Sequence, residues 1–187
     1  EALPAADLDS EDGVTQAALA EAIATDRAYL DADLEAFNVD AMAGPQVDLL
    51  NIPSFQPIDT DEDIRRLRDR WLAMAGYLDE SGNALRRGLA DGRVGVTAIC
   101  QRVGEQLDEL LRRPDADWPL ADPGRGRPQL EAELTEIIAT RIRPAFERYR
   151  SLVVDEITPH ARSDAKPGLV HLPNGAATYA SLDSANT

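Results

Sequence analysis

The residue types that most often carry out chemistry in proteins are sparse in this sequence. It contains two histidines, His160 and His171, and a single cysteine, Cys100. Glu156 precedes His160 by four residues, a spacing that can place two metal ligands on one helix face. Pro159 disturbs that geometry, and a cation near a helix C-terminus explains His160 without a metal. No His-Glu-x-x-His pattern occurs, so we predict no metal ligand and no catalytic residue within this sequence.

Two other chemical motifs are better explained by structure. The acidic run 59–63 resembles the start of a calcium loop, but Ile64 and Arg70 stand where that loop needs Gly and Glu. We interpret these acids as favourable charges at a helix N-terminus. Cys100 occupies an apolar position, which favours a buried and inert thiol. A single cysteine also excludes an internal disulfide.

Charge is unevenly distributed along the 187 residues, whose formal net charge is −15. Residues 1–63 hold 16 acidic side chains and one basic side chain, whereas 64–187 hold 18 of each. Such an acidic chain lacks the clustered Lys and Arg that bind nucleic-acid phosphates or an anionic membrane surface. No run of 18 apolar residues is present, so we expect no membrane span. The 43% hydrophobic share is enough for a folded core.

The elements that must position any site are helices, because no segment alternates like a strand. Apolar residues recur every three or four positions in four segments: 15–37, 60–89, 97–111 and 128–157. A last short helix is expected after Asn174-Gly175. We therefore predict an all-α fold, an irregular multi-helix array in which residues 1–187 form a single helical segment.

Capping and helix-breaking residues locate the expected helix ends and irregularities. Thr60 with Asp63 forms a capping-box pattern, and Thr97 is expected to cap the following helix. Gly76 permits a break or kink. Pro144 lies inside the longest apolar stripe, so we predict one long helix that is kinked at this proline.

Three irregular segments separate the predicted helices, at 38–58, 112–127 and 163–173. The first is the most informative, because it is rich in proline, apolar and without helical period. A long apolar crossing loop either lies across the body of a protein or lines a site. Trp118 is expected to anchor the second segment.

Four runs, in this order and spacing, resemble a known bacterial family. They are FNVDAMAGPQVDLLNIPSFQPI (37–58), YLDESGNALRRGLADGRV (77–94), RPAFERYRSLVVDEITPHAR (143–162) and GLVHLPNGAATYASL (168–182). The family is the domain of unknown function 885, and the resemblance spans most of residues 15–187. Its members are mostly helical, much longer than this chain, and look like zinc metallopeptidases.

The resemblance implies a function in which this chain is one part. The family's likely zinc ligands lie in a His-Glu-Ala-x-Pro-Gly-His-His run, which these 187 residues lack. We therefore expect the chain to be the non-catalytic N-terminal helical part of a zinc-dependent peptidase or hydrolase. It would form a wall of the substrate channel and pack against the remaining C-terminal part of its own chain. Zinc is expected in the full-length parent, with no cofactor in this segment.

The same resemblance indicates where a peptide-like substrate would be bound. The crossing 38–58 and the loop 168–179 are expected to lie nearest the cleft. Hydrogen bonds to substrate are expected from three residues of the second segment, His171, Asn174 and Tyr179.

Two alternatives stay open at the level of sequence. Mixed surface charge and solvent-facing helices fit a helical binding or scaffold module with no catalytic role equally well. The lack of disulfides favours a cytoplasmic location. Export is the alternative, because we expect the true N-terminus to lie upstream of Glu1.

Overall fold

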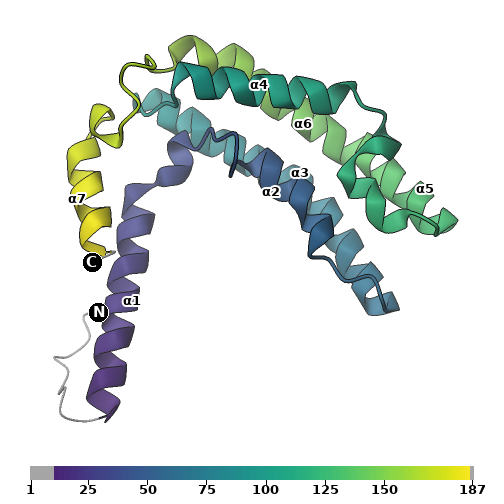
Figure 1. Cartoon of the computed structure of the whole chain (residues 1–187), viewed down its shortest axis with the longest axis horizontal. Coiled ribbons are helices and arrows are strands. Elements are labelled where there is room, and N and C mark those ends of the chain that lie inside the picture. Colours follow the sequence, from purple (N-terminus) through teal and green to yellow (C-terminus); the bar gives the residue numbers. More distant parts are fainter. Residues whose placement is uncertain (1–10, 186–187) are drawn as a thin grey trace. The chain divides into compact units, whose positions relative to one another are not determined.

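The computed structural model describes residues 11–185, and residues 1–10 and 186–187 lie outside that range (Figure 1). Within the described range the regular secondary structure is helical, and the β feature is a single bridge between Val96 and Arg162. The prediction of an all-α fold is therefore confirmed. The chain divides into two compact units, of which the first holds the described residues 11–34 and 168–185 and the second 35–167. That residues 1–187 act as a single segment stays a prediction.

The first unit consists of α1 (Glu11–Ala32) packed against α7 (Gly175–Ala185). The predicted helix over 15–37 ends earlier than expected, because Asp33 has a φ of 42° and a 3-10 turn, Leu34–Phe37, follows it. The apolar stripe of α1 is only partly covered. Leu19 and Leu30 keep 54% and 79% of their surface exposed.

The longest helix of the second unit is α3 (Asp61–Ala90). Its capping box is confirmed, since the Thr60 hydroxyl accepts a hydrogen bond from the Asp63 N–H at 3.1 Å while the Asp63 carboxylate accepts from the Thr60 N–H at 3.0 Å. The break that Gly76 permits does not occur, and α3 continues through this residue. A glycine keeps the backbone hydrogen bonds of a helix, and here the space around its Cα is open, so nothing forces a bend. The helix stops at Asp91, before Gly92 with its φ of 70°.

The long helical stripe over 128–157 is built from four successive pieces. These are α5 (Pro128–Ile137), a π-helical turn (Ile138–Ile142), α6 (Arg143–Ser151) and a second π-helical turn (Leu152–Ile157). Pro144 falls in the first turn of α6, directly after a widened turn, where its missing N–H costs least. The irregularity predicted at this proline therefore takes the form of a π-helical turn before it.

The prediction that 38–58 is irregular throughout is wrong for its middle. Pro45–Asn51 forms the short helix α2, with the proline in its first turn, where no backbone donor is needed. The irregular part before α2 is held by two amide side chains. Gln46 Nε2 donates to the Asp40 carbonyl at 2.8 Å, and Gln106 Nε2 donates to the Ala41 carbonyl at 3.0 Å. The second bond ties the crossing to α4 (Thr97–Arg112).

Helix α4 (Thr97–Arg112) begins differently from the sequence prediction. Its N-cap residue is Val96, and Thr97 is the first residue inside the helix. The Thr97 hydroxyl instead donates to the Arg162 carbonyl at 2.8 Å, and the Thr97 N–H bonds the same oxygen at 2.9 Å. This threonine therefore joins α4 to the chain that leaves the second π-helical turn.

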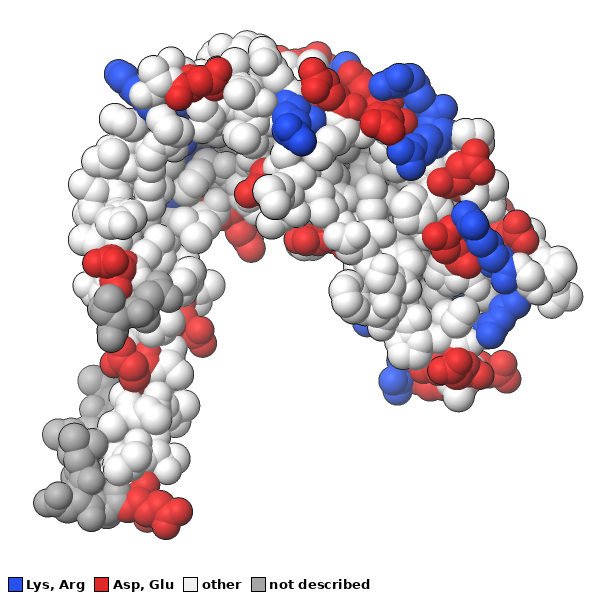
Figure 2. Space-filling view, viewed as in Figure 1, with Lys and Arg blue, Asp and Glu red and all other residues white. Residues whose placement is uncertain are grey.

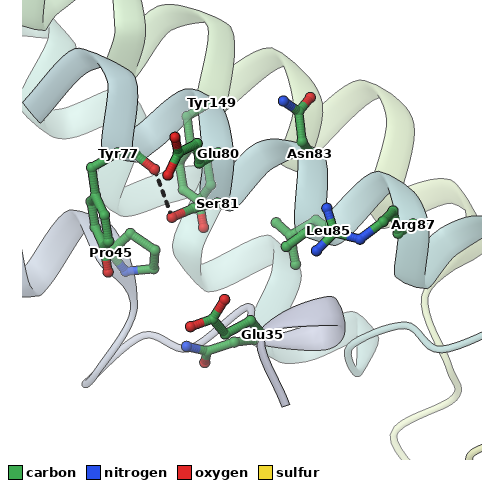
Figure 3. Close-up of a pocket in the computed structure, with 11 residues that line it drawn as sticks. Glu35, Pro45, Tyr77, Glu80, Ser81, Asn83, Leu85, Arg87 and Tyr149 are labelled. Carbon is green, nitrogen blue, oxygen red and sulfur yellow. Dashed lines mark hydrogen bonds between the residues drawn. The ribbon is translucent and has the colours of Figure 1, made fainter. Parts of the chain in front are cut away.

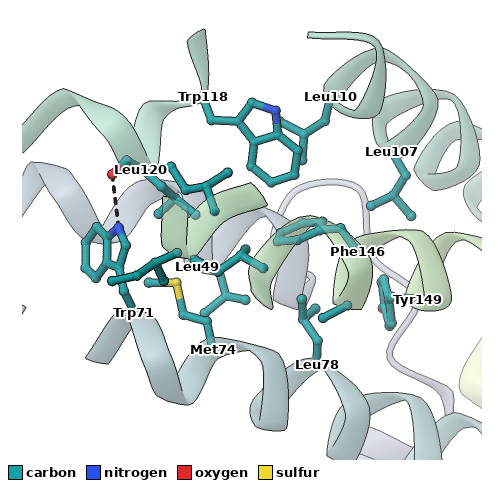
Figure 4. Packing of buried hydrophobic residues seen from close by; sticks show 14 of the residues in the cluster. Leu49, Trp71, Met74, Leu78, Leu107, Leu110, Trp118, Leu120, Phe146 and Tyr149 are labelled. Atoms are coloured by element: carbon teal, nitrogen blue, oxygen red, sulfur yellow. Dashed lines mark hydrogen bonds between the residues drawn. The ribbon is translucent and has the colours of Figure 1, made fainter. Parts of the chain in front are cut away.

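The core of the second unit lies between α3, α4, α5 and α6 (Figure 4). Trp71 on α3 donates its indole N–H to the Leu120 carbonyl at 3.0 Å, which fixes the 112–127 segment against the helix. Trp118 is fully buried and meets Phe146 edge-on, with ring centroids 5.3 Å apart. The expected anchoring role of Trp118 is confirmed.

Arginine and acidic side chains alternate over the surface of the second unit. Figure 2 shows them interleaved on the visible face, and pairs such as Arg148–Asp79 and Arg150–Asp108 have N–O distances of 2.8 Å. No helix in the described range is long and apolar enough to cross a bilayer.

Candidate functional site: a polar pocket beside α3

The three residues expected to bind substrate lie in the first unit. His171 ends a 3-10 turn, Leu169–His171, and its side chain is exposed. Asn174 has a φ of 58° and directly precedes α7, where its carbonyl accepts a hydrogen bond from the Thr178 N–H at 2.9 Å. Tyr179 lies on α7 and is 61% exposed. All three side chains lie within residues 168–179, and their role in substrate binding stays a prediction.

The residues considered as metal ligands are engaged elsewhere or stand apart. The Glu156 carboxylate accepts two hydrogen bonds from Arg86, at 3.0 and 2.8 Å, and this pairing lowers the pKa of Glu156. His160 is exposed at the end of its helix. Among residues 11–185, no group of three or more His, Cys, Asp or Glu side chains could hold a metal ion. The described residues therefore do not fit the zinc ion that the resemblance implies.

Cys100 is fully buried, and burial raises the pKa of its thiol from 9.0 to about 11. A thiol with that pKa is almost entirely protonated at neutral pH, and the thiolate is the nucleophilic form. The prediction that the thiol is buried is confirmed, and its raised pKa supports the prediction that it is inert.

A pocket of about 460 Å³ opens between α3 and the segment 35–45 (Figure 3). Most of its lining residues can hydrogen-bond or carry charge. Its polar lining residues are Glu35, Asn38, Tyr77, Glu80, Ser81, Asn83, Arg87 and Tyr149.

The close approach of the chain to α3 depends on Gly88. A Cβ at this position would lie 1.7 Å from the Ala36 carbonyl oxygen, so only glycine allows the 3-10 turn 34–37 to rest on the helix. This contact carries Glu35 and Asn38 to the pocket. Pro45, at the start of α2, lines the same pocket, so the crossing contributes to its wall.

Tyr149 is the most deeply buried polar residue of the pocket. It comes from α6, keeps only 2% of its surface exposed, and its hydroxyl has no hydrogen-bond partner in the described chain. Figure 3 shows it beside Ser81, whose own hydroxyl donates to the Tyr77 carbonyl at 2.9 Å. Burial raises the pKa of the Tyr149 hydroxyl, and nearby Tyr77 adds to the rise. The group therefore stays protonated and can donate a hydrogen bond to a ligand.

Three charged side chains of the pocket are also without partners. Glu35, Glu80 and Arg87 make no side-chain hydrogen bond or ion pair within residues 11–185. The neighbouring face of α3 is different, because Arg86 is paired with Glu156 there. Charged groups in the pocket are thus available to an external ligand.

The crossing also lines a smaller cavity of about 280 Å³ beside α4. Gln46 and Gln106 both contribute to its wall, and their amide carbonyl oxygens have no partner in the described chain. Their amide nitrogens hold the crossing in place, so this cavity is explained first by loop anchoring.

One family model matches the chain, over residues 1–187, and it is described as a bacterial protein of unknown function (DUF885). The chain belongs to the DUF885 family. The resemblance carried by the four sequence runs is thereby confirmed for the family, whose description names no activity. No curated protein and no solved structure matches this DUF885 chain.

Sequence reasoning did not single out the charged and buried residues of the pocket. Glu80, Arg87 and Tyr149 nevertheless lie in two of the runs that carry the DUF885 resemblance, 77–94 and 143–162. Those runs were the available signal, but spacing alone could not show that α3 and α6 bring the three residues to one pocket.

Proposed function

We propose that this DUF885 chain binds a peptide-like substrate, without cleaving it, as the helical wall of a zinc-dependent peptidase. The Tyr149 hydroxyl carries the proposal, because it is 98% buried within a polar pocket and lacks a protein partner. Buried polar groups are nearly always hydrogen-bonded, so a ligand that supplies the missing acceptor explains this one. The carbonyl of a peptide is such an acceptor.

The remaining lining supports a peptide over an apolar ligand. A pocket of about 460 Å³ is within the size range that holds small ligands. Peptides carry both hydrogen-bond donors and acceptors, and the pocket offers both, through Asn83, Ser81 and Tyr77. The family resemblance to zinc metallopeptidases makes a peptide the expected substrate.

The chain's own residues take a binding and orienting role in this proposal. Because residues 11–185 do not fit a zinc ion, the proposal assigns the metal to residues outside that range. His171, Asn174 and Tyr179 are proposed as further hydrogen-bonding residues, and a Tyr179→Phe substitution should raise KM while leaving kcat unchanged.

The proposal is tested by assaying the native protein that contains these residues on short peptides, with and without a chelator. We expect hydrolysis that is lost on chelation and restored by zinc. A Tyr149→Phe variant should raise KM several-fold, because only a binding contact is removed. Chelator-insensitive hydrolysis, or no hydrolysis with zinc bound, would overturn the peptidase assignment.

The exposed stripe of α1 favours a second candidate function, a helical binding or scaffold module. Ile23 is 50% exposed and lies between Leu19 and Leu30 on that stripe. If the chain is such a module, it should bind a partner protein and no peptide. The double substitution Leu19→Gln and Leu30→Gln should then abolish the protein–protein association. Peptide binding that survives both substitutions favours the first function.

A further inference from the structure

The free charges of the pocket are arranged along one face of α3. Glu80 and Arg87 are seven residues apart, so they lie two turns apart on the same face, about 10 Å along the helix axis. Glu35 faces this helix from the 3-10 turn 34–37. Glu80 and Arg87 therefore place an acidic and a basic group two turns apart on α3, and Glu35 lies opposite them.

The spacing of Glu80 and Arg87 along the helix axis is close to the length of a short peptide with free ends. An extended chain covers at most about 3.3–3.6 Å per residue, so the terminal groups of a tripeptide are on the order of 10 Å apart. An α-ammonium group and an α-carboxylate at that separation complement one carboxylate and one guanidinium. The buried hydroxyl of Tyr149 lines the same pocket beside Ser81 and can donate to a backbone carbonyl of the peptide.

We propose that the pocket binds a peptide of two or three residues by its two free termini. Glu80 binds the α-ammonium group, Arg87 binds the α-carboxylate, and the Tyr149 hydroxyl donates to a backbone carbonyl. This inference rests on the proposed function and narrows its substrate to short peptides with unblocked ends. An enzyme with this wall would cleave short peptides rather than internal bonds of proteins.

Other ligands complement the pocket less well. Two unpaired carboxylates oppose a phosphate group, which excludes a nucleotide as the favoured ligand. A metal ion would leave the guanidinium of Arg87 facing a like charge. A simple diamine satisfies Glu35 and Glu80 but gives Arg87 no partner.

The test measures equilibrium binding of three probes to the native protein by titration calorimetry, with chelator present and the peptides checked for integrity. The probes are tri-alanine, N-acetyl-tri-alanine and tri-alanine amide. We expect blocking of either end to weaken binding about tenfold or more, because each block removes one charge pair. Glu80→Gln should weaken tri-alanine about tenfold and leave the N-acetyl peptide unchanged. Arg87→Gln should weaken tri-alanine about tenfold and leave the binding of tri-alanine amide unchanged.

Matched controls come from α4, where Glu105→Gln and Arg102→Gln remove exposed charges outside the pocket and should leave all three affinities unchanged. Equal affinity for free and N-acetylated peptides would overturn this inference while leaving the proposed function in place. Absence of binding by every peptide would overturn both. Tighter binding of 1,5-diaminopentane than of tri-alanine, or displacement of tri-alanine by calcium, would assign the acidic groups to another cation and overturn the inference.

Discussion

Replacing Tyr149 by Phe should separate stability from binding, because its hydroxyl is buried without a partner in the ligand-free chain. The residue is 2% exposed, and phenylalanine keeps the ring that packs in the core. An unpaired buried hydroxyl costs roughly 1–3 kcal/mol relative to its hydrated state. We therefore expect Tyr149→Phe to leave the free energy of unfolding unchanged or to raise it by up to about 2 kcal/mol.

The same substitution should weaken peptide binding. A neutral hydrogen bond contributes about 0.5–1.5 kcal/mol, which corresponds to a roughly two- to tenfold higher Kd. The assay is urea unfolding of both proteins, with and without saturating tri-alanine. Because a ligand stabilises only the folded state that binds it, the peptide should stabilise Tyr149→Phe less than the unmodified protein.

Tyr179→Phe serves as the stability control, because that side chain is 61% exposed and should change unfolding very little. The reasoning is refuted if Tyr149→Phe lowers the unfolding free energy by more than about 1 kcal/mol without peptide. Such a loss would show that the hydroxyl already has a favourable partner in the free protein.

Three further predictions concern the helices around the pocket. Gly76→Ala should stabilise the protein by about 0.5–1 kcal/mol, because its Cβ meets open space in a helix interior. Gly88→Ala should destabilise the protein by about 1–3 kcal/mol, because its Cβ collides with the Ala36 carbonyl. The urea midpoints of the two variants measure these changes, and equal effects would contradict the prediction. Arg143→Lys should lower the free energy of unfolding by about 2 kcal/mol, because the planar guanidinium of Arg143 bonds Asp115 and two backbone carbonyls. An unchanged Tm in thermal unfolding would contradict that role. In the folded state burial raises the pKa of the Cys100 thiol to about 11, whereas the unfolded thiol ionises near 9.0. The free energy of unfolding therefore falls as pH rises between these two values, by about 1.4 kcal/mol per pH unit from this group. The free energy of unfolding should therefore fall less between pH 7 and pH 10.5 in Cys100→Ala than in the unmodified protein.

The helical content and most helix ends could be predicted because they depend on local sequence. Thr60 with Asp63, and Asp91 with Gly92, act within one turn of their own helix. Thr97 was misjudged because its hydroxyl bonds Arg162, a partner 65 residues away that no local pattern reveals. Local capping preferences lose to such long-range bonds when the tertiary contact satisfies the same group.

The candidate site was harder to predict because its residues are distant in sequence and ordinary in type. Glu80 on a solvent-facing helix position and Tyr149 on an apolar stripe both fit a purely structural interpretation. Their significance depends on the absence of partners, which becomes visible only when α3 and α6 are packed. Sequence reasoning instead favoured His171, whose residue type is distinctive but whose side chain lies exposed on a short turn.

Two features of the second unit that disfavour stability lie at or beside the pocket. Gly88 gives up helix propensity so that the Ala36 carbonyl can approach, and Tyr149 buries a hydroxyl without a partner. Glu80 and Arg87 stay unpaired, although most arginines of this unit, such as Arg86, have an acidic or carbonyl partner. A sequence selected only for folding would replace Tyr149 by phenylalanine without losing stability. The buried hydroxyl of Tyr149 is therefore better explained by a ligand that supplies its missing partner than by a defect of packing.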